Sequence, residues 1–326
     1  MFTNDMTTRR PDWLRPLGNT GLTVSAVCAG GSPLGSMPEV FGYDLPREEA
    51  IACVTRILAG PITFLDTANG YSDGESERRI GAALAQAGGV PDGFVLATKV
   101  DRDAATGDYS GARVHASVRE SLQRLGLPRV PLLYLHDPEP ISFEEGMAPG
   151  GPVEALLQIK RDGLAEHLGV AGGRVDLMRR YIDTGAFEVL LTHNRWTLVD
   201  RSAGDLIAAA ANAGVAVVNA AVFGGGVLAK GTAALSRYAY REAPPEVLDR
   251  IRGMEAACAR HGVPLGAAAL QFSLRDPRIA STVVGFSRPD RVAAIAEQAS
   301  CDIPEELWDE LEELLPPRQY WLDGGV

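Results

Sequence analysis

An acid and a phenol five residues apart, Asp66 and Tyr71, lie where a short apolar run ends in a turn. Residues 63 to 67 form a predicted strand, Asn69 and Gly70 interrupt it, and a helical period begins at Ser76. Asp66 and Tyr71 are therefore expected at the carboxyl end of a strand, which is the edge where parallel sheets commonly carry their reactive side chains.

Two further polar residues end neighbouring apolar runs. Lys99 closes the run Leu96-Ala97-Thr98-Lys99, and His136 closes Leu133-Tyr134-Leu135-His136. If these runs are consecutive parallel strands, Asp66, Lys99 and His136 approach one point from three adjacent strand ends, with Tyr71 on the loop above.

These four side chains suggest proton transfer. A free tyrosine has a pKa of about 10, but an ammonium about 4 Å away could lower it by at most about 3 units. Asp66 would hold the Lys99 ammonium in place, and Tyr71 would then serve as a general acid or base. His136 would hold the same substrate oxygen. None of the four accepts electrons, so interconversion of a carbonyl and an alcohol would need a borrowed hydride, for which nicotinamide is the simplest source.

Each residue also has an ordinary structural interpretation. Asp66 alone could cap a turn, Tyr71 could be a packed phenol, and His136 could be a capping or core histidine. Lys99 is harder to explain in this way, because burying an unpaired ammonium is costly. Their joint placement at three strand ends favours a catalytic site.

The elements that must position these residues alternate along the whole chain. Eight apolar runs are predicted as strands buried on both faces: Val24–Gly31, Thr63–Ala68, Phe94–Val100, Pro131–His136, His167–Gly172, Val189–Asn194, Ala216–Phe223 and Ser281–Ser287. Each is followed by a helical pattern: Arg47–Ala59, Ser76–Ala87, Ala112–Leu125, Pro152–Arg161, Val175–Asp183, Ala203–Ala213, Leu265–Leu274 and Pro289–Ala299. This alternation predicts an α/β fold, a closed (β/α)8 TIM barrel, in preference to an open doubly wound sheet.

Three segments lie outside the repeat. Leu14–Leu22 is predicted as an N-terminal hairpin across the barrel floor, Pro244–His261 as an extra helix after the seventh strand, and Pro304–Leu315 as a C-terminal helix. No linker or low-complexity stretch separates these parts, so residues 1–326 are predicted as a single domain.

Composition narrows the possible partners. The net charge of -11 disfavours nucleic acid and anionic membranes, both of which require a basic face, and leaves small molecules as the expected ligands. Met1 to Arg10 lacks the apolar core of a signal peptide, and no run of about 18 apolar residues occurs, so a cytoplasmic protein is expected. The expected assembly is a monomer or a weak homo-oligomer. The four cysteines form no Cys-x-x-Cys pair and the five histidines no His-x-His pair, so no metal site is predicted.

With these residues in place, the chain resembles the aldo-keto reductase superfamily over nearly its whole length. The resemblance includes the Asp66 to Tyr71 spacing, residues 17–25, the start of the helix at Glu75-Ser76-Glu77, Thr98-Lys99 and Tyr134-Leu135-His136. It implies a barrel enzyme that uses NAD(P)(H), with Asp66, Tyr71, Lys99 and His136 as its catalytic tetrad.

Residues 193–201 and 218–229 resemble the branch that contains L-fucose, D-threo-aldose 1- and pyridoxal 4-dehydrogenases. The resemblance implies oxidation of a cyclic hemiacetal to a lactone, with Tyr71 as the base. The alternatives are a general aldehyde or ketone reductase and a non-catalytic cofactor-sensing subunit; a metal-dependent hydrolase built on Asp66 and His136 is disfavoured by the histidine count.

Cofactor contacts are also implied by the resemblance, with departures from the family pattern. They are expected from Gly31, Ser32, His193, Val222, Phe223, Gly224, Leu228, Gly285, Phe286, Ser287 and Arg291. Gly169-Val170-Ala171-Gly172-Gly173 replaces a frequent Ser-Asn pair, and Gly285 replaces a lysine that often grips a 2′-phosphate. Arg288 or Arg291 could supply that contact, so NAD and NADP both remain possible, with a slight preference for NAD.

Substrate contacts are expected on the loops above the tetrad, at residues 41–43, 101–109, 137–150 and 319–322. Tyr43, Trp196 and Trp321 are the candidate substrate-binding residues, the two tryptophans as walls of an apolar or sugar-stacking pocket. The alternative for Trp196 is ordinary packing under a loop.

Overall fold

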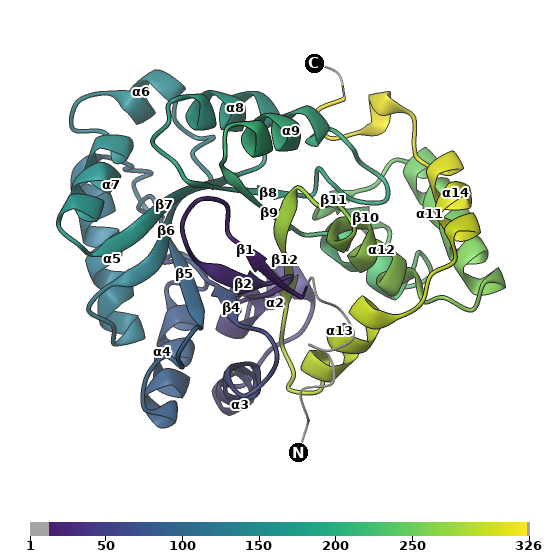
Figure 1. Cartoon of the computed structure of the whole chain (residues 1–326), viewed down its shortest axis with the longest axis horizontal. Coiled ribbons are helices and arrows are strands. Elements are labelled where there is room, and N and C mark those ends of the chain that lie inside the picture. Colours follow the sequence, from purple (N-terminus) through teal and green to yellow (C-terminus); the bar gives the residue numbers. More distant parts are fainter. Residues whose placement is uncertain (1–12, 325–326) are drawn as a thin grey trace.

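A computed structural model describes residues 13–324. Eight parallel strands close into a barrel in the order β12-β3-β4-β5-β6-β7-β8-β9, and helices surround it (Figure 1). The barrel strands are β3 (Val27–Gly30), β4 (Phe64–Asp66), β5 (Val95–Val100), β6 (Val130–His136), β7 (Ala165–Gly172), β8 (Val189–His193), β9 (Ala216–Ala220) and β12 (Ile279–Gly285). The predicted (β/α)8 barrel is confirmed.

The helices that follow these strands match the predicted set to within about two residues at each end. They are α3 (Arg47–Leu58), α4 (Glu75–Ala87), α5 (Gly111–Leu125), α7 (Pro152–Arg161), α8 (Val175–Asp183), α9 (Gly204–Asn212), α12 (Leu265–Leu274) and α13 (Arg291–Ser300). Gly88 and Gly126 end α4 and α5 with left-handed backbones, which glycine adopts at little cost.

All three additions to the repeat are confirmed. β1 (Leu14–Pro16) and β2 (Thr23–Ser25) form an antiparallel hairpin, and Gly18 in its turn lies against Ala216 at the start of β9, which places the hairpin on the barrel floor. The extra helices are α11 (Pro245–Arg260) and α14 (Glu305–Glu313), which pack against each other beside the barrel. The first predicted strand is divided, because the Ser25 hydroxyl accepts from the Thr63 amide and donates to the Val27 carbonyl, which separates β2 from β3.

Short elements in the loops were not predicted. They are α2 (Pro38–Phe41), α6 (Phe143–Met147), α10 (Val227–Lys230), the hairpin β10 (Arg237–Tyr238) and β11 (Arg241–Glu242), and the 3-10 turns η1 (Ser32–Gly35), η2 (Gly224–Gly226) and η3 (Arg318–Tyr320). The seventh barrel strand stops at Ala220 and not at Phe223, because Ala221 has a left-handed backbone with φ of 57°.

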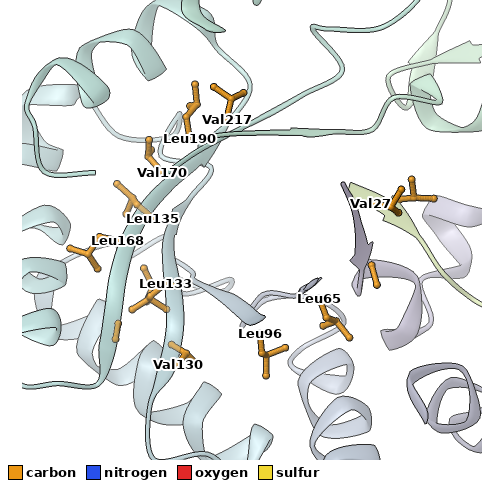
Figure 2. Close-up of a cluster of buried hydrophobic side chains, with 14 of the residues drawn as sticks. Val27, Leu65, Leu96, Val130, Leu133, Leu135, Leu168, Val170, Leu190 and Val217 are labelled. Atoms are coloured by element: carbon orange, nitrogen blue, oxygen red, sulfur yellow. The ribbon is translucent and has the colours of Figure 1, made fainter. Parts of the chain in front are cut away.

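The two-residue period of the strands decides which side chains face the barrel interior. Leu133 and Leu135 belong to the apolar layer between strands and helices, which Figure 2 shows, whereas Leu132 and Tyr134 belong to the interior cluster. His136 has the same parity as Tyr134. By the same rule, Asp66 lies two residues after Phe64 and Lys99 two residues after Ala97, and both Phe64 and Ala97 face the interior. All three polar residues at the strand ends therefore point inward.

Candidate active site

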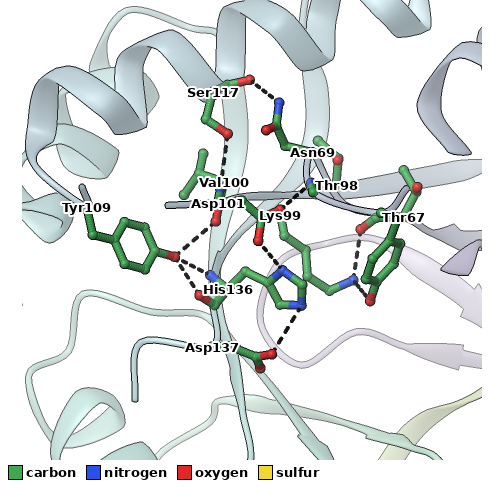
Figure 3. A network of polar contacts seen from close by, with 12 residues as sticks. Thr67, Asn69, Thr98, Lys99, Val100, Asp101, Tyr109, Ser117, His136 and Asp137 are labelled. Atoms are coloured by element: carbon green, nitrogen blue, oxygen red, sulfur yellow. Dashed lines mark hydrogen bonds and ion pairs between the residues drawn. The ribbon is translucent and has the colours of Figure 1, made fainter. Parts of the chain in front are cut away.

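Hydrogen bonds join the polar ends of β4, β5 and β6 into one network (Figure 3). The Lys99 ammonium donates to the Asp66 carboxylate at 2.6 Å, to the Thr67 carbonyl at 2.8 Å and to the Tyr71 hydroxyl at 3.1 Å. An ammonium has three protons, so these contacts use them all. The Tyr71 oxygen therefore accepts from Lys99, and its own proton is free to point elsewhere.

Burial makes the Asp66–Lys99 pair an unusual one. Asp66 is 3% exposed and Lys99 1% exposed. Burial raises the pKa of Asp66, although the Lys99 ammonium opposes this shift. Burial acts to lower the pKa of Lys99, but the charges of Asp66 and Tyr71 outweigh it and raise that pKa above its usual value. Lys99 is thus held as an ammonium at physiological pH.

The pKa of Tyr71 differs from the sequence-based prediction. Burial of the hydroxyl raises its pKa above the usual value of about 10, and the Lys99 ammonium offsets only part of this effect. The prediction considered the attraction of Lys99 and omitted the desolvation, so its direction is wrong for the protein alone. The Tyr71 hydroxyl is consequently a proton donor near neutral pH.

His136 faces Tyr71 across a short gap. The two rings meet edge to face, with centroids 5.5 Å apart and an interplanar angle of 82°. The His136 Nδ1 atom lies 2.6 Å from a carboxylate oxygen of Asp101, which is the first residue after β5. Burial acts to lower the pKa of His136, but the carboxylates of Asp101 and Asp137 outweigh it and raise that pKa. Two groups that differ in their hold on a proton therefore face each other: the Tyr71 hydroxyl, which keeps its proton, and the His136 imidazole, which readily changes its charge.

Sequence reasoning placed Asp101 in a substrate loop and missed its contact with His136. A signal was present, because Asp101 is a carboxylate just beyond a strand end, two residues after Lys99. Tyr109 was missed as well. Its hydroxyl accepts from the His136 amide at 3.0 Å and lies 2.6 Å from the His136 carbonyl, so it holds the end of β6 (Figure 3).

A second carboxylate lies on the other side of the His136 ring. An oxygen of Asp137 is 3.8 Å from His136 Nε2, and its other oxygen is 3.6 Å from His193 Nε2. Partial desolvation by the surrounding groups acts to raise the pKa of Asp137, but the neighbouring histidines outweigh it and hold that pKa well below its usual range. Because the Asp137 side chain is 56% exposed, it offers an ionised oxygen pair at the mouth of the site.

The residues proposed for cofactor binding come from one arc of the barrel rim. They lie at or after the ends of β3, β8, β9 and β12, and β9, β12 and β3 are consecutive neighbours that adjoin the tetrad strands β4 to β6. Three of them, Val222, Leu228 and Phe286, are fully buried, backbone included. Contact of these three with a cofactor stays a prediction, since they expose neither side chain nor backbone here.

Arg291, at the start of α13, fits an anionic group. Burial lowers its pKa, and the nearby Arg288 lowers it further, while the phenol of Tyr43 acts in the opposite direction. Among residues 13–324, no carboxylate lies within ion-pair distance of Arg291, whereas Arg288 pairs with Asp290 at 3.3 Å. A partly buried cation of this kind at a helix N-terminus suits a phosphate. The proximity of Tyr43 places this predicted substrate residue on the α13 side of the rim.

The glycine triplet after β9 has a structural explanation of its own. Gly224, Gly225 and Gly226 all have positive φ angles. A Cβ atom at Gly224 would lie 2.4 Å from the Tyr238 ring, so β10 packs directly on the turn. Tight turning and packing thus account for glycine here without a bound pyrophosphate.

Trp196 and Trp321 occupy different environments. Trp196 packs against Phe272 of α12, with ring centroids 5.5 Å apart, and Arg278 lies over its ring. These contacts favour packing between helices over a substrate wall. Trp321 donates its indole N–H to the Pro316 carbonyl at 2.9 Å and is half-buried.

The segment around Trp321 lies on the rim. The Leu322 amide donates to the Asp200 carboxylate at 2.7 Å, and Asp323 pairs with Arg195 at 2.8 Å and accepts from the Val175 amide that begins α8. These bonds hold the C-terminal tail across the loops that follow β7 and β8. The expectation that Trp321 borders the substrate is compatible with this position.

Among residues 13–324, no three histidine, cysteine, aspartate or glutamate side chains are placed to hold a metal ion. None of the helices in this range has the length and apolar character needed to cross a membrane. Met1 to Arg10, where no signal peptide is predicted, lies outside the described residues.

Comparisons with known proteins agree with this geometry. The chain is 32% identical to D-threo-aldose 1-dehydrogenase of a Pseudomonas species, covering 90% of this chain and 94% of that protein. L-galactose dehydrogenase of Arabidopsis thaliana is also 32% identical (93% and 94% covered), and pyridoxal 4-dehydrogenase of Microbacterium luteolum is 28% identical (91% and 96% covered). An aldo-keto reductase from Bacillus halodurans, solved in its holo form, shares the fold with a TM-score of 0.75 at 23% identity, covering 93% and 96% of the two chains.

The family model for aldo/keto reductases matches residues 27–316, which include every barrel strand and all four tetrad residues. Members of this family are oxidoreductases that use NAD(P)(H) and act on small carbonyl compounds and their alcohols. The protein is thus an oxidoreductase, and the chain belongs to the aldo/keto reductase family.

Proposed function

We propose that this enzyme oxidises a cyclic hemiacetal to the lactone. The first candidate substrate is an L-fucose-like aldose, oxidised at its anomeric hydroxyl, and the second is the hemiacetal of pyridoxal. The observation that carries the proposal is the Lys99 ammonium, which spends its three protons on Asp66, Thr67 and Tyr71. These contacts support Tyr71 as the group that exchanges a proton with the substrate oxygen.

When bound, the nicotinamide of the cofactor accepts the hydride. In the oxidation, the bond between C1 and its hydrogen breaks with both electrons leaving as hydride, the hydroxyl proton passes to Tyr71, and the C1–O bond becomes a carbonyl. Tyr71 must be a phenolate to accept that proton, and burial favours its protonated form. Oxidation is therefore favoured by alkaline pH, and reduction of a carbonyl by neutral pH.

The polarity of the mouth supports a hydroxyl-rich substrate. Asp137 and His193 lie beside His136, and the Asp137 carboxylate is both ionised and exposed. A carboxylate accepts hydrogen bonds from sugar hydroxyls and repels anionic compounds. Neutral sugars are consequently favoured over phosphorylated sugars and acids, in keeping with the activities for which the two relatives that share 32% identity are named.

We infer NAD as the preferred cofactor, held between the rim residues after β3 and β12 and the start of α13. Gly285, at the end of β12, has no side chain to contact a 2′-phosphate. The Arg288–Asp290 pair also counts against NADP, because the Asp290 carboxylate compensates the arginine and repels a second phosphate. Arg291 is then the cation for the pyrophosphate that both cofactors share.

Arg291→Ala is expected to weaken NAD and NADP binding alike, by about 10- to 100-fold, since a charge-assisted bond to phosphate contributes roughly 1.5–3 kcal/mol. Fluorescence titration of both cofactors measures this loss. Arg161→Ala, at the end of α7, removes a surface arginine bound to Gln158 and serves as the control. A loss confined to NADP would assign Arg291 to the 2′-phosphate and reverse the inferred preference.

A dehydrogenase screen tests the proposed activity. NAD and NADP are each supplied with L-fucose, L-galactose, other aldoses, pyridoxal and simple aldehydes, and reduced nicotinamide is followed by absorbance from pH 6 to 10. Lactone formation from an aldose with NAD supports the proposal. Turnover of simple aldehydes alone would favour a general reductase, and saturable cofactor binding without any turnover would favour a cofactor-sensing subunit.

A further inference from the structure

The carboxylate of Asp101 determines which nitrogen of His136 carries a proton. His136 Nδ1 lies 2.6 Å from Asp101 Oδ1. An ionised carboxylate can accept a hydrogen bond but cannot donate one, so Nδ1 must carry the hydrogen. Neutral His136 then has a bare Nε2, and this is the nitrogen left for a substrate.

Asp101 is anchored on both sides. Its second oxygen, Oδ2, accepts from the Gly70 amide at 2.6 Å, and Gly70 directly precedes Tyr71. A Cβ atom at Gly70 would lie 3.0 Å from Asp101 Cγ, so a larger residue would displace the carboxylate by a few tenths of an ångström. The Asp101 backbone donates to Ser117 and accepts from Arg113, both on α5. One carboxylate thus ties the Tyr71 loop to the His136 ring.

We propose that Asp101 is a positioning residue for the reaction, which holds His136 in its Nδ1–H form with Nε2 free to meet the same substrate oxygen as Tyr71. This inference rests on the proposed function and adds a residue that acts through His136. Aspartate plays the equivalent part for histidine in hydrolytic triads, where it holds the correct tautomer. The tetrad thereby becomes a set of five residues in this chain.

The charge of His136 then decides whether it can bind the substrate oxygen. The substrate hydroxyl has a single proton, which passes to Tyr71, so His136 must donate to that oxygen through Nε2. Because Nδ1 is committed to Asp101, Nε2 carries a hydrogen only in the protonated ring. Oxidation and reduction pass through the same transition state, so both use this charge state.

Several charged groups set that titration, and they come from β4, β5, the start of the β5–α5 loop, the end of β6 and the Tyr71 loop. They are Asp66, Lys99, Asp101, Asp137 and Tyr71. Lys99 opposes protonation of His136, whereas Asp101 and Asp137 favour it and prevail. His136 is protonated at low pH, so its donation to the substrate oxygen is lost in both directions as the pH rises through its raised pKa.

Asp101→Asn is the informative variant. Its amide oxygen can still accept from Gly70, which leaves the amide nitrogen to face His136 Nδ1. Because that nitrogen donates, the variant favours the opposite tautomer, with hydrogen on Nε2. We expect kcat to fall by about 10- to 100-fold, because the variant no longer stabilises the protonated ring that donates to the substrate oxygen, while KM changes less than about threefold.

Nitrogen-15 NMR of the histidine rings reads the tautomer and the titration in the cofactor-free enzyme, independently of any turnover. In the wild type, Nδ1 is expected to stay protonated throughout, and in Asp101→Asn the His136 midpoint is expected to fall by roughly one pH unit. The alkaline limb that His136 contributes to the pH profile should move by the same amount. An unchanged tautomer and midpoint would overturn the inference even if activity fell.

Two controls separate a positioning role from a general disturbance. Glu310→Gln changes a similar carboxylate–imidazole contact, in which Glu310 Oε1 lies 2.7 Å from Nε2 of His261, the residue after α11. This variant should leave activity unchanged. In a His136→Ala background, Asp101→Asn should lower kcat by less than about threefold further. A full additional loss there would show that Asp101 does not act through His136. Absence of hydride transfer in the wild type would count against the proposed function, and the NMR result would still decide the tautomer.

Discussion

Tyr71→Phe is expected to lower kcat by about 10²- to 10⁴-fold, the usual contribution of a positioned general acid or base. Phenylalanine keeps the ring that meets His136 edge to face and removes the one oxygen that can exchange a proton with the substrate. The hydroxyl accepts one of the three Lys99 bonds, so the fold should lose little stability. Cofactor affinity should stay within about twofold, because Tyr71 adjoins the substrate oxygen and not the rim that holds phosphate.

Stopped-flow measurement of reduced nicotinamide, with cofactor titration by fluorescence, separates the chemical step from binding. Tyr181→Phe is the matched control, because the hydroxyl of Tyr181 is buried and makes no side-chain hydrogen bond in the described part of the protein. That control should turn over normally. Normal turnover by Tyr71→Phe itself would remove Tyr71 from the reaction and with it the proposed mechanism.

The fold was predictable because its signals are local and repeated. Eight apolar runs alternate with eight helical patterns, and the two-residue period then places Asp66, Lys99 and His136 on the inner side of three neighbouring strands. Lys99 was the most informative residue, since an ammonium within an apolar run needs a buried partner. The structure supplies that partner, Asp66, at 2.6 Å.

The chemistry of the site was less predictable, because it depends on competing effects over long sequence separations. Asp101 and His136 are 35 residues apart, and no periodicity shows that the loop after β5 turns back toward the end of β6. The pKa of Tyr71 depends on the balance between burial and the Lys99 charge, and the sequence reveals the charge more readily than the burial. Trp196 was ambiguous for the same reason, since its partner Phe272 is 76 residues away on α12 (272 minus 196).

Lys99→Met is expected to lower the free energy of unfolding by about 3–5 kcal/mol and to abolish measurable hydride transfer. Removing the ammonium leaves the Asp66 carboxylate buried without its compensating charge, which is the costly way to break a buried ion pair. Asp66 Oδ1 already has no hydrogen-bond partner among the described residues, so only the more distant charge of His136 remains to compensate the carboxylate. Tyr71 loses the donor that fixes its hydroxyl.

Urea unfolding at several pH values measures this deficit and its sign. Burial raises the pKa of Asp66 in the folded protein, and without Lys99 that pKa rises further. A carboxyl with a raised folded pKa destabilises the protein above that pKa and ceases to do so once it is protonated. The difference between wild type and Lys99→Met should therefore be largest near neutral pH and shrink as the pH falls through the folded pKa of Asp66.

Two variants distinguish a buried charge from a lost side chain. Lys160→Met breaks a half-exposed pair with Glu188 and should cost less than about 1 kcal/mol, as surface pairs do. Adding Asp66→Asn to Lys99→Met removes the unpaired charge and should restore most of the lost stability without restoring activity, because Tyr71 still lacks its donor. If the double variant is as unstable as Lys99→Met, the cost arises from packing, and Asp66 is not the charge that Lys99 compensates.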